Sequence, residues 1–186
     1  LGLRYYDDLQ LRIPHSEVSQ IFSEIRLLAP DAHMECVGSY RRGLPDSGDV
    51  DIIVRKDAAS AAIAAAIATR KCGEKPIHGC VETLSRGRSR VSFLYRGWVY
   101  MRQVDLLYVV PAEYGAAILY FTGSWDFNEA MRSLAKRHGL RLNQMGLFDR
   151  ATGQLIHAET EKGIFRALNL AYVPPHERTG ARALVA

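Results

Sequence analysis

The sequence is poor in cysteine, has no long apolar run and carries a net charge of only +4 over 186 residues. Its three cysteines, Cys36, Cys72 and Cys80, are an odd number without a CxxC pair. This argues against a disulfide scaffold and against a thiolate zinc site. No run of about 18 apolar residues is available to span a membrane, and the polar residues 1–8 are unlike a signal peptide. An apolar fraction of 48% excludes disorder, so we expect an intracellular globular protein without a membrane partner.

The small net charge hides an uneven distribution along the chain. Residues 1–69 carry 7 basic and 10 acidic side chains, residues 70–102 carry 8 and 2, and residues 103–186 carry 9 and 8. A basic stretch beside an acidic one indicates a polyanion site next to a cation site. Solvated faces of ordinary helices and strands give the same pattern, so charge alone does not choose between the two interpretations.

Apolar periodicity and turn residues predict an α+β protein. The order is helix, strand, helix, several strands and then a helix-rich segment, which differs from regular βαβ alternation. A shift in composition near residues 111–123 predicts a sheet-based module over residues 1–112 and a smaller module over 113–186. The predicted helices are 14–29, 58–68, 113–121, 124–138 and 160–171, and the predicted strands are 50–54, 91–95, 98–101 and 104–110, with a hairpin at 148–156.

Three aspartates occur in or beside predicted strands. Asp49 and Asp51 are two residues apart, so a strand places both carboxylates on one face. Two neighbouring carboxylates repel each other, and a Mg²⁺ ion removes that repulsion while taking the hard oxygen ligands that it prefers. Asp105, isolated in another apolar strand, completes a site for two metal ions. Taken singly, Asp49 also fits a turn and Asp105 an edge strand.

The loop before the first aspartate adds a candidate phosphate site. Gly38 and Ser39 offer backbone N–H groups and a hydroxyl at a helix start, and Arg42 offers a guanidinium fork that matches phosphate. The full pattern is Gly-Ser-x(8)-Gly-Asp-x-Asp, in which Gly48 directly precedes the carboxylate pair. A triphosphate site beside a metal site indicates nucleotidyl transfer, with a hydroxyl attacking the α-phosphate and pyrophosphate leaving.

These motifs, in this order, resemble the family X DNA polymerases of the beta and lambda type over nearly the whole chain. The resemblance implies a nucleotidyltransferase palm over residues 1–112, with a mixed or antiparallel sheet flanked by helices, followed by a small α/β thumb over 113–186. The matching segments are 3–14 (LRYYDDLQLRIP), 38–43 (GSYRRG), 47–51 (SGDVD), 104–106 (VDL), 120–124 (YFTGS) with Phe127, Asn128, Met131 and Arg132, and a closing segment from Glu161 to Arg178.

The resemblance also implies roles for individual residues. Asp49 and Asp51 bind both metal ions, two Mg²⁺ for which Mn²⁺ substitutes, while Asp105 binds the catalytic ion and accepts the primer hydroxyl proton. The phosphates of the nucleotide are held by Gly38, Ser39, Arg42 and Gly48, with Arg12 at the position of another phosphate-facing arginine. Tyr120 and Phe121, next to Gly123, pack against the sugar and exclude a ribose 2′-hydroxyl. Asn128 contacts the incoming base, Arg132 the template side, and Arg86 and Arg90 the template backbone.

The implied function is template-directed addition of dNMP to a primer 3′-hydroxyl, as in short-gap filling during DNA repair. The expected partners are primer–template or gapped DNA and dNTP, and the expected location in a eukaryote is the nucleus or the mitochondrion. In template-independent members of the family, the pair at this position resembles Gly-Trp, whereas this chain has Tyr120-Phe121. The difference favours template-directed synthesis. A terminal transferase and another nucleotidyltransferase remain the alternatives.

The chain departs from the family pattern at three positions and at its N-terminus. Gln103 stands where the family commonly has Arg, Gln144 where beta-type enzymes have a Glu that helps to lock the thumb, and Trp125 where a small or acidic residue adjoins the nucleotide. No fingers or lyase segment precedes Leu1. The sequence is therefore expected to be either a minimal palm-and-thumb enzyme or a piece of a longer repair polymerase, in which missing N-terminal regions bind repair proteins, and no lyase activity is expected.

Overall fold

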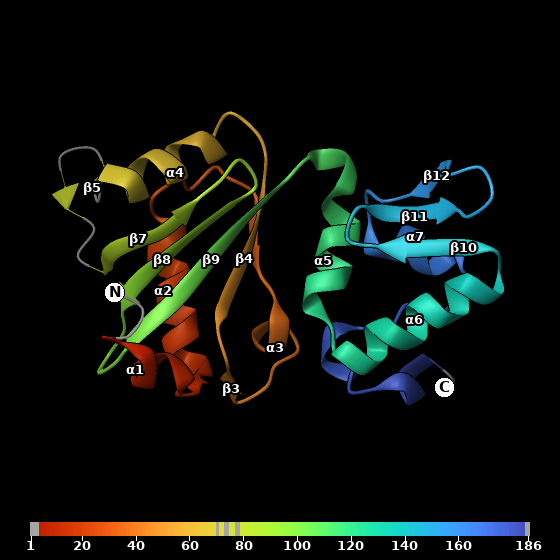
Figure 1. Cartoon of the computed structure of the whole chain (residues 1–186), viewed down its shortest axis with the longest axis horizontal. Helices are drawn as coiled ribbons and strands as arrows, with labels where there is room; N and C mark the ends of the chain where they lie inside the picture. The colour runs from red at the N-terminus through yellow and green to blue at the C-terminus, as the bar shows by residue number, and fades with distance from the viewer. Residues whose placement is uncertain (1–3, 70, 73–74, 77–78, 185–186) are drawn as a thin grey trace. The chain divides into compact units, whose positions relative to one another are not determined.

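The computed structural model describes residues 4–69, 71–72, 75–76 and 79–184 of the chain. The chain forms two compact units, which Figure 1 draws together. The first unit contains residues 1–36 and 44–108, and the second contains residues 37–43 and 109–186. Both units combine helices with sheets, so the α+β class expected from the sequence is confirmed. Residues 37–43, which lie within the predicted first module, belong to the second unit.

A five-stranded sheet forms the centre of the first unit. Strands β4 and β9 run in the same direction, whereas the remaining neighbours are antiparallel, so the sheet is mixed (Figure 1). The order across the sheet is β2 (Met34–Cys36), β4 (Val50–Arg55), β9 (Met101–Val109), β8 (Arg90–Arg96) and β7 (Cys80–Arg86). Short two-stranded ladders join β1 (Ile13–Pro14) to β3 (Asp46–Ser47) and β5 (Lys71–Cys72) to β6 (Lys75–Pro76).

Apolar faces of the helices and strands make the core of the first unit. Helix α2 (His15–Arg26) buries Val18, Ile21 and Ile25, which recur at helical spacing. Helix α4 (Ser60–Thr69) buries Ile63 and Ile67, and α1 (Tyr6–Gln10) precedes β1. Strand β4 contributes fully buried Val50, Ile52, Ile53 and Val54. A strand that is buried on both faces reads as a nearly continuous apolar run, which is why its sequence identified it.

The hairpin between β8 and β9 differs from the sequence prediction. Trp98, Val99 and Tyr100 were expected in a strand, but they lie in the turn, and β9 runs without a break from Met101 to Val109. The Gly97 N–H donates to the Tyr100 carbonyl, which closes the turn, and the Trp98 N–H donates to Glu17 of α2. A side chain at Gly97 would overlap the Glu17 carboxylate. The contact with Glu17 of α2 therefore determines the conformation of this turn.

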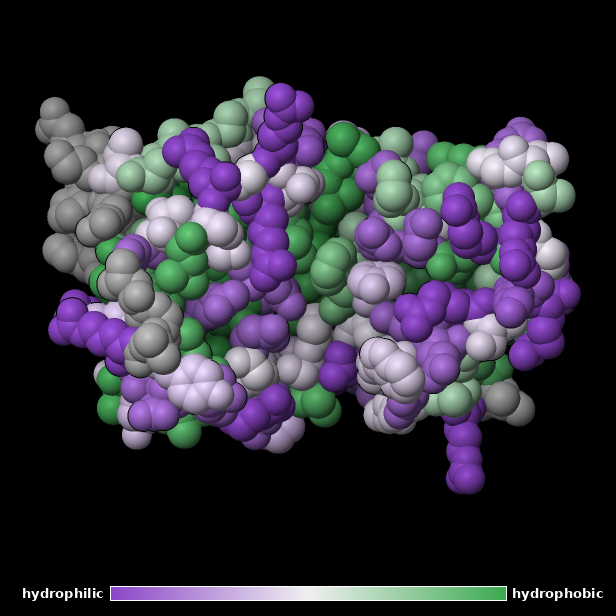
Figure 2. Space-filling view, in the orientation of Figure 1, coloured by the Kyte–Doolittle hydropathy of each residue, from purple (hydrophilic) through white to green (hydrophobic). Residues whose placement is uncertain are grey.

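The second unit is a helical layer on a three-stranded antiparallel sheet (Figure 1). Its core is formed by the apolar faces of α5, α6 and α7 and by β10 and β11, with Phe127, Met131 and Phe165 at its centre. Figure 2 shows apolar residues gathered over α5, while polar side chains cover the exposed face of α6. Its elements are α3 (Gly38–Arg41), η1 (Pro111–Glu113), α5 (Tyr114–Thr122), α6 (Trp125–Arg137), β10 (Leu140–Asn143), β11 (Gly146–Asp149), β12 (Leu155–His157), α7 (Glu161–Ala167), η2 (Pro175–Glu177) and η3 (Ala181–Leu184).

Two of the three cysteines lie among the residues whose side chains the structure describes. Cys36 and Cys80 are buried, and the side chain of Cys72 lies outside the described residues. Among the described residues no helix has the length and apolar character needed to cross a bilayer.

Candidate active site

The sheet of the first unit brings the three predicted aspartates together. Asp49 immediately precedes β4, Asp51 is the second residue of β4, and Asp105 lies in the middle of β9. Strands β4 and β9 are neighbours in the sheet, and neighbouring strands are only about 4.8 Å apart. Three carboxylates from two separate parts of the chain therefore share one region of the sheet.

The negative charges of these carboxylates act on one another. Burial, followed by the charges of Asp49 and Asp105, raises the pKa of Asp51 to about 7. The pKa of Asp49 is also raised, first by removal from water and then by the charge of Asp105, although Arg12 and Arg90 oppose the shift. A positive charge placed among these groups would relieve the repulsion.

Asp105 is buried and its two oxygens are fully engaged. Arg90 of β8 approaches both of them, with Nε 3.2 Å from Oδ1 and Nη2 2.7 Å from Oδ2. The Ser92 hydroxyl donates to Oδ1, and the Gln103 amide donates to Oδ2 at 3.0 Å. Asp105 and Ser92 face each other in the β8–β9 register. The contact with Asp105 also raises the pKa of Arg90, so its guanidinium stays charged.

The donor chemistry suits a divalent cation, but the arrangement does not yet form a metal site. No group of three or more His, Cys, Asp or Glu side chains is placed to hold a metal ion among the residues that the structure describes. Carboxylate oxygens are the ligands that Mg²⁺ prefers. A carboxylate has about four lone-pair positions, and those of Asp105 face four donor contacts from Arg90, Ser92 and Gln103. The three aspartates therefore fit Mg²⁺ by type and charge, and Asp105 is the one already occupied.

Arg12 and Gly48 lie together at the edge of this region. The Arg12 guanidinium donates to the Asp46 carboxylate at 2.6 and 2.8 Å and to the Asp46 carbonyl. A Cβ atom at Gly48 would come within 3.3 Å of the Arg12 guanidinium. Glycine at this position therefore leaves space for the arginine beside the aspartates.

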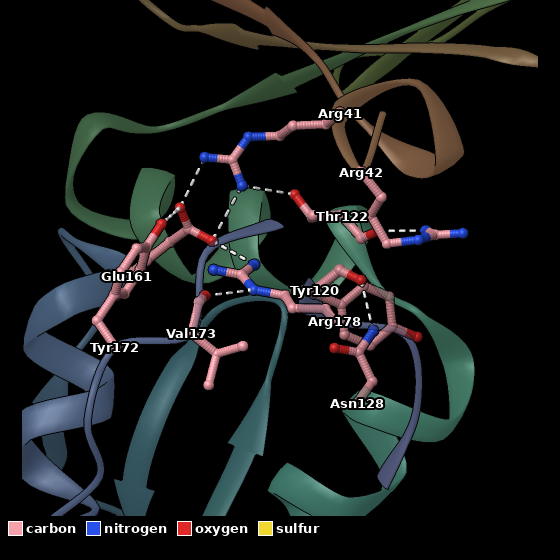
Figure 3. Close-up of polar contacts among 9 residues, drawn as sticks. All are labelled: Arg41, Arg42, Tyr120, Thr122, Asn128, Glu161, Tyr172, Val173 and Arg178. Atoms are coloured by element: carbon pink, nitrogen blue, oxygen red, sulfur yellow. Dashed lines mark hydrogen bonds and ion pairs between the residues drawn. The ribbon is translucent and has the colours of Figure 1, made fainter. Parts of the chain in front are cut away.

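The other part of the predicted nucleotide motif belongs to the second unit. Gly38 has φ +66°, a left-handed conformation that favours glycine, and it begins the short helix α3. Arg42 donates to the Thr122 carbonyl at 2.5 Å at the end of α5 (Figure 3). Burial lowers the pKa of Arg42. Gly123 has φ +69°, and a side chain there would press on the Arg42 guanidinium at 3.1 Å.

A buried ion network in the second unit was not foreseen from the sequence. Glu161, the first residue of α7, accepts two hydrogen bonds from Arg41, at 2.7 and 3.1 Å, and one from Arg178 at 2.7 Å (Figure 3). Arg178 is 0% exposed and also donates to the Val173 carbonyl. Its guanidinium lies 5.5 Å from the ring centres of Phe127, Phe165 and Tyr172. The spacing of charges along the chain does not signal this network, because its members are far apart in sequence.

Three of the predicted nucleotide and template contacts, Tyr120, Asn128 and Arg132, line one small pocket of the second unit, and Phe121 is not among its lining residues. Tyr120 and Phe121 form an edge-to-face pair with ring centres 5.1 Å apart. The Asn128 amide donates to the Tyr120 carbonyl at 2.6 Å, which links α6 to α5 (Figure 3). The pocket is lined by Ala116, Leu119, Tyr120, Asn128, Arg132, Leu142 and Asn143. Helices α5 and α6 therefore bring Tyr120, Asn128 and Arg132 together, as helical spacing predicts.

The three predicted DNA contacts occupy different environments. Arg86 is exposed at the end of β7, and Arg132 is partly buried on α6. Arg90 is 54% exposed, but it pairs with Asp105 instead of pointing only to solvent. The predicted contact of Arg90 with template DNA stays a prediction, since the described structure engages it with a candidate metal ligand.

Two family models match successive parts of the chain. Residues 12–96 match the model described as DNA polymerase beta palm, and residues 117–179 match the model described as DNA polymerase beta thumb. The first match includes Asp49 and Asp51, and the second includes Tyr120, Asn128 and Glu161.

Curated relatives match over almost the whole chain. It is 31% identical to DNA polymerase lambda of Rattus norvegicus, over 96% of this chain and 35% of that protein. It is 29% identical to DNA polymerase lambda of Arabidopsis thaliana, over 96% of this chain and 38% of that protein. It is 27% identical to the DNA-directed DNA/RNA polymerase mu of Homo sapiens, over 95% of this chain and 43% of that protein. The chain thus spans well under half of the length of these relatives.

Proposed function

The chain belongs to the family X DNA polymerases, and we propose that it is a template-directed DNA polymerase. The reaction adds dNMP to a primer 3′-hydroxyl and releases pyrophosphate, and we assign it to the filling of short gaps during DNA repair. The observation that carries the proposal is the cluster of Asp49, Asp51 and Asp105, whose burial and mutual repulsion raise the pKa of Asp51 to about 7. Such a cluster is costly without a cation, and it is the donor set that nucleotidyl transfer requires.

Asp49, Asp51 and Asp105 would hold two Mg²⁺ ions, with Mn²⁺ as a substitute. When bound, these ions supply positive charge for the triphosphate and for the attacking hydroxyl. In our proposal, Asp105 also accepts the proton of the primer 3′-hydroxyl. Its contacts with Ser92 and Gln103 hold the carboxylate in a fixed orientation, as a general base requires.

The phosphates of dNTP are held by groups of the glycine-bracketed segment. Ser39 offers its hydroxyl, Arg42 its planar guanidinium and Gly38 its backbone N–H. Arg42 donates through Nη1 to the Thr122 carbonyl, which holds one end of its guanidinium, and in our proposal its other N–H groups bind phosphate oxygens. We assign Gly48 and Arg12 of the first unit to phosphate binding as well.

Sugar, base and DNA contacts come from the second unit and from the basic stretch. Tyr120 and Phe121, at the end of α5 and before Gly123, pack against the deoxyribose and exclude a 2′-hydroxyl. Asn128 contacts the incoming base, and Arg132 contacts the template side. Arg86 binds template phosphates, which position DNA without reading its sequence.

Two alternatives remain within nucleotidyl transfer. A terminal transferase would add nucleotides without a template, and another nucleotidyltransferase would use RNA or a small molecule. One relative is named a DNA/RNA polymerase, so the use of ribonucleotides is the feature to test most directly.

The deciding experiment is primer extension on a one-nucleotide gap with each dNTP, each rNTP and Mg²⁺. We expect addition set by the template base and far weaker use of rNTP, because Tyr120 and Phe121 leave no room for ribose. Equal addition of all four bases to a single strand would establish a terminal transferase instead, and equal use of rNTP would refute the sugar assignment.

Asp105→Asn tests the chemical role of the cluster. The variant keeps the size of the side chain but removes its charge and its basicity, so extension should fall by about 10³-fold or more while gapped-DNA binding persists. Asp31→Asn, an exposed aspartate of the same unit, is the matched control and should extend normally. Unchanged extension by Asp105→Asn would overturn the proposed site.

A further inference from the structure

Asp105 has a buried carboxylate, and its cationic partner comes from the surface. The carboxylate side chain is 4% exposed, whereas the Arg90 side chain that pairs with it is 54% exposed. Arg90 is the first residue of β8, and Ser92, two residues along the same strand, faces Asp105. Side chains two residues apart lie on one face of a strand. The Arg90 guanidinium therefore reaches from solvent over the sheet to the carboxylate.

Within the described chain, Arg90 is the only cation that contacts Asp105. Its two nitrogens make the forked contact at 3.2 and 2.7 Å, and the other two donors, Ser92 and Gln103, are neutral. Leaving a buried carboxylate without a counter-charge is strongly unfavourable. Arg90 thus supplies the charge that Asp105 needs while no divalent ion is present.

The same contact prevents Asp105 from serving as a metal ligand. Four donor contacts fill the lone-pair positions of the two oxygens, and no metal-holding group is found among the described residues. A divalent ion that binds Asp105 must therefore take the place of at least one donor. Arg90 is the donor best able to leave, because its half-exposed guanidinium is rehydrated at small cost, as exposed ion pairs contribute little to stability.

We propose that Arg90 is an internal counter-ion that occupies Asp105 in the DNA-free protein and leaves it when a DNA phosphate takes its guanidinium. Arg90 is then a positioning residue that makes DNA binding a condition for full metal binding at Asp105. The inference rests on the proposed function, since it takes Asp105 as a metal ligand. In this proposal the Arg90 side chain has two alternative partners, the Asp105 carboxylate in the free protein and a DNA phosphate in the complex.

The exchange balances charge at both sites. In the free protein the guanidinium neutralises Asp105, and in the complex a divalent ion neutralises Asp105 while the guanidinium neutralises a phosphate. Neither the carboxylate nor the guanidinium is left unpaired. Binding of DNA and binding of metal should therefore strengthen each other, and by thermodynamic linkage each should change the affinity of the other by the same factor.

Mn²⁺ binding to the full chain tests the inference without any turnover. Free Mn²⁺ is measured by electron paramagnetic resonance for the unaltered protein, Arg90→Gln, Arg90→Lys and Arg88→Gln, without DNA and then with gapped DNA that ends in a dideoxynucleotide. Arg88→Gln removes a charge of the same sign from an exposed position, two residues before Arg90. Circular dichroism of each variant verifies that it is folded.

We expect Arg90→Gln to bind Mn²⁺ about three- to tenfold more tightly than the unaltered protein when DNA is absent, because the competing cation is gone. Arg90→Lys, which keeps the charge but loses the fork, should lie between them, and Arg88→Gln should match the unaltered protein. DNA should tighten Mn²⁺ binding to the unaltered protein by a similar factor, and this gain should be largely lost in Arg90→Gln.

Four results would overturn the inference. The first is an Mn²⁺ affinity of Arg90→Gln equal within error to that of Arg88→Gln. The second is weaker Mn²⁺ binding by Arg90→Gln, which would make Arg90 a support for the metal ligand. Equal gains from DNA in both proteins would also refute the exchange. If Mn²⁺ bound normally to Asp105→Asn, Asp105 would not be a ligand, and the metal site of the proposed function would fail together with this inference.

Discussion

At the scale of single residues, the aspartates show how burial and like charge act on one group. Asp51 lies in β4, and burial, together with the charges of Asp49 and Asp105, raises its pKa to about 7. In the unfolded chain the same carboxyl titrates near 3.8. Between these two values the folded state retains a proton that the unfolded state has released, so the free energy of unfolding falls as the pH rises. The candidate site therefore reduces the stability of the metal-free protein at neutral and alkaline pH.

Asp51→Asn should stabilise the metal-free protein, and the gain should depend on pH. The amide cannot ionise, so the variant avoids the cost of a buried charge, about 2–4 kcal/mol at pH 8. The gain should shrink to below about 1 kcal/mol at pH 4, where the folded form of Asp51 is protonated and the unfolded form, with a pKa near 3.8, is only partly ionised. Urea unfolding in EDTA at pH 4, 6 and 8 measures this gain in stability. The fluorescence of Trp98 reports unfolding in a Trp125→Phe background. A variant less stable than its parent at pH 8 would contradict the assigned repulsion.

At the scale of helices and strands, the second unit depends on charges that cross between elements. Glu161 begins α7, Arg41 ends α3, and Arg178 follows η2. Burial alone would raise the pKa of Glu161, but hydrogen bonds and charges from Arg41 and Arg178 outweigh it and lower the pKa. The carboxylate therefore contributes stability above its unfolded pKa, and that stability is lost as the pH falls through the lower folded pKa.

Glu161→Gln should destabilise the second unit by about 3–5 kcal/mol at pH 7, because it leaves two buried guanidinium groups without their carboxylate. The deficit should shrink below pH 4, where the native carboxylate is itself being protonated. Urea unfolding, monitored by the fluorescence of Trp125 in a Trp98→Phe background, measures this loss of stability. Glu159→Gln, an exposed glutamate two residues away, is the control. Equal stability of the two variants would show that the network is not stabilising.

Local patterns predicted the long elements well and the short ones poorly. Helix α6 was expected over 124–138 and spans Trp125–Arg137, because its amphipathic pattern and the Ser124 cap are both local signals. Strands β2 and β10, of three and four residues, were missed since so few residues show no period. The seven-residue strand β7 (Cys80–Arg86) is the exception among the longer strands: it was also missed, because its burial does not alternate along the strand. The turn at Trp98–Tyr100 was misassigned to a strand because its conformation depends on Glu17, a distant residue.

At the scale of the whole molecule, the near-neutral charge is a sum of unlike parts. The acidic residues 1–69 include two of the clustered aspartates, and the basic residues 70–102 include Arg86 and Arg90. A protein with this distribution can attract cations at one site and a polyanion at another. A net charge of +4 is therefore weak evidence on nucleic-acid binding in either direction.

Binding of gapped DNA should weaken steeply with salt, because each phosphate contact releases counter-ions. Arg86→Ala should weaken binding by a similar factor on every sequence and reduce the slope of log K against log salt by about 1. Arg150→Ala, an exposed arginine of the second unit, changes the net charge equally and serves as the control. Fluorescence anisotropy from 50 to 300 mM salt gives both slopes. Identical slopes for the two variants would remove Arg86 from the DNA contact.

The sequence by itself determined the fold class, the longer helices and strands, and the residue types of the candidate site. These depend on local spacing, as in Gly38 to Asp51 and in the helical interval from Asn128 to Arg132. Only the tertiary structure decided which charges meet. It paired Arg90 with Asp105 and joined Arg41, Glu161 and Arg178. Such pairings depend on strand order and on burial, because the strength of an ion pair is set by distance and solvent exclusion in space, and neither quantity is encoded in the separation along the chain.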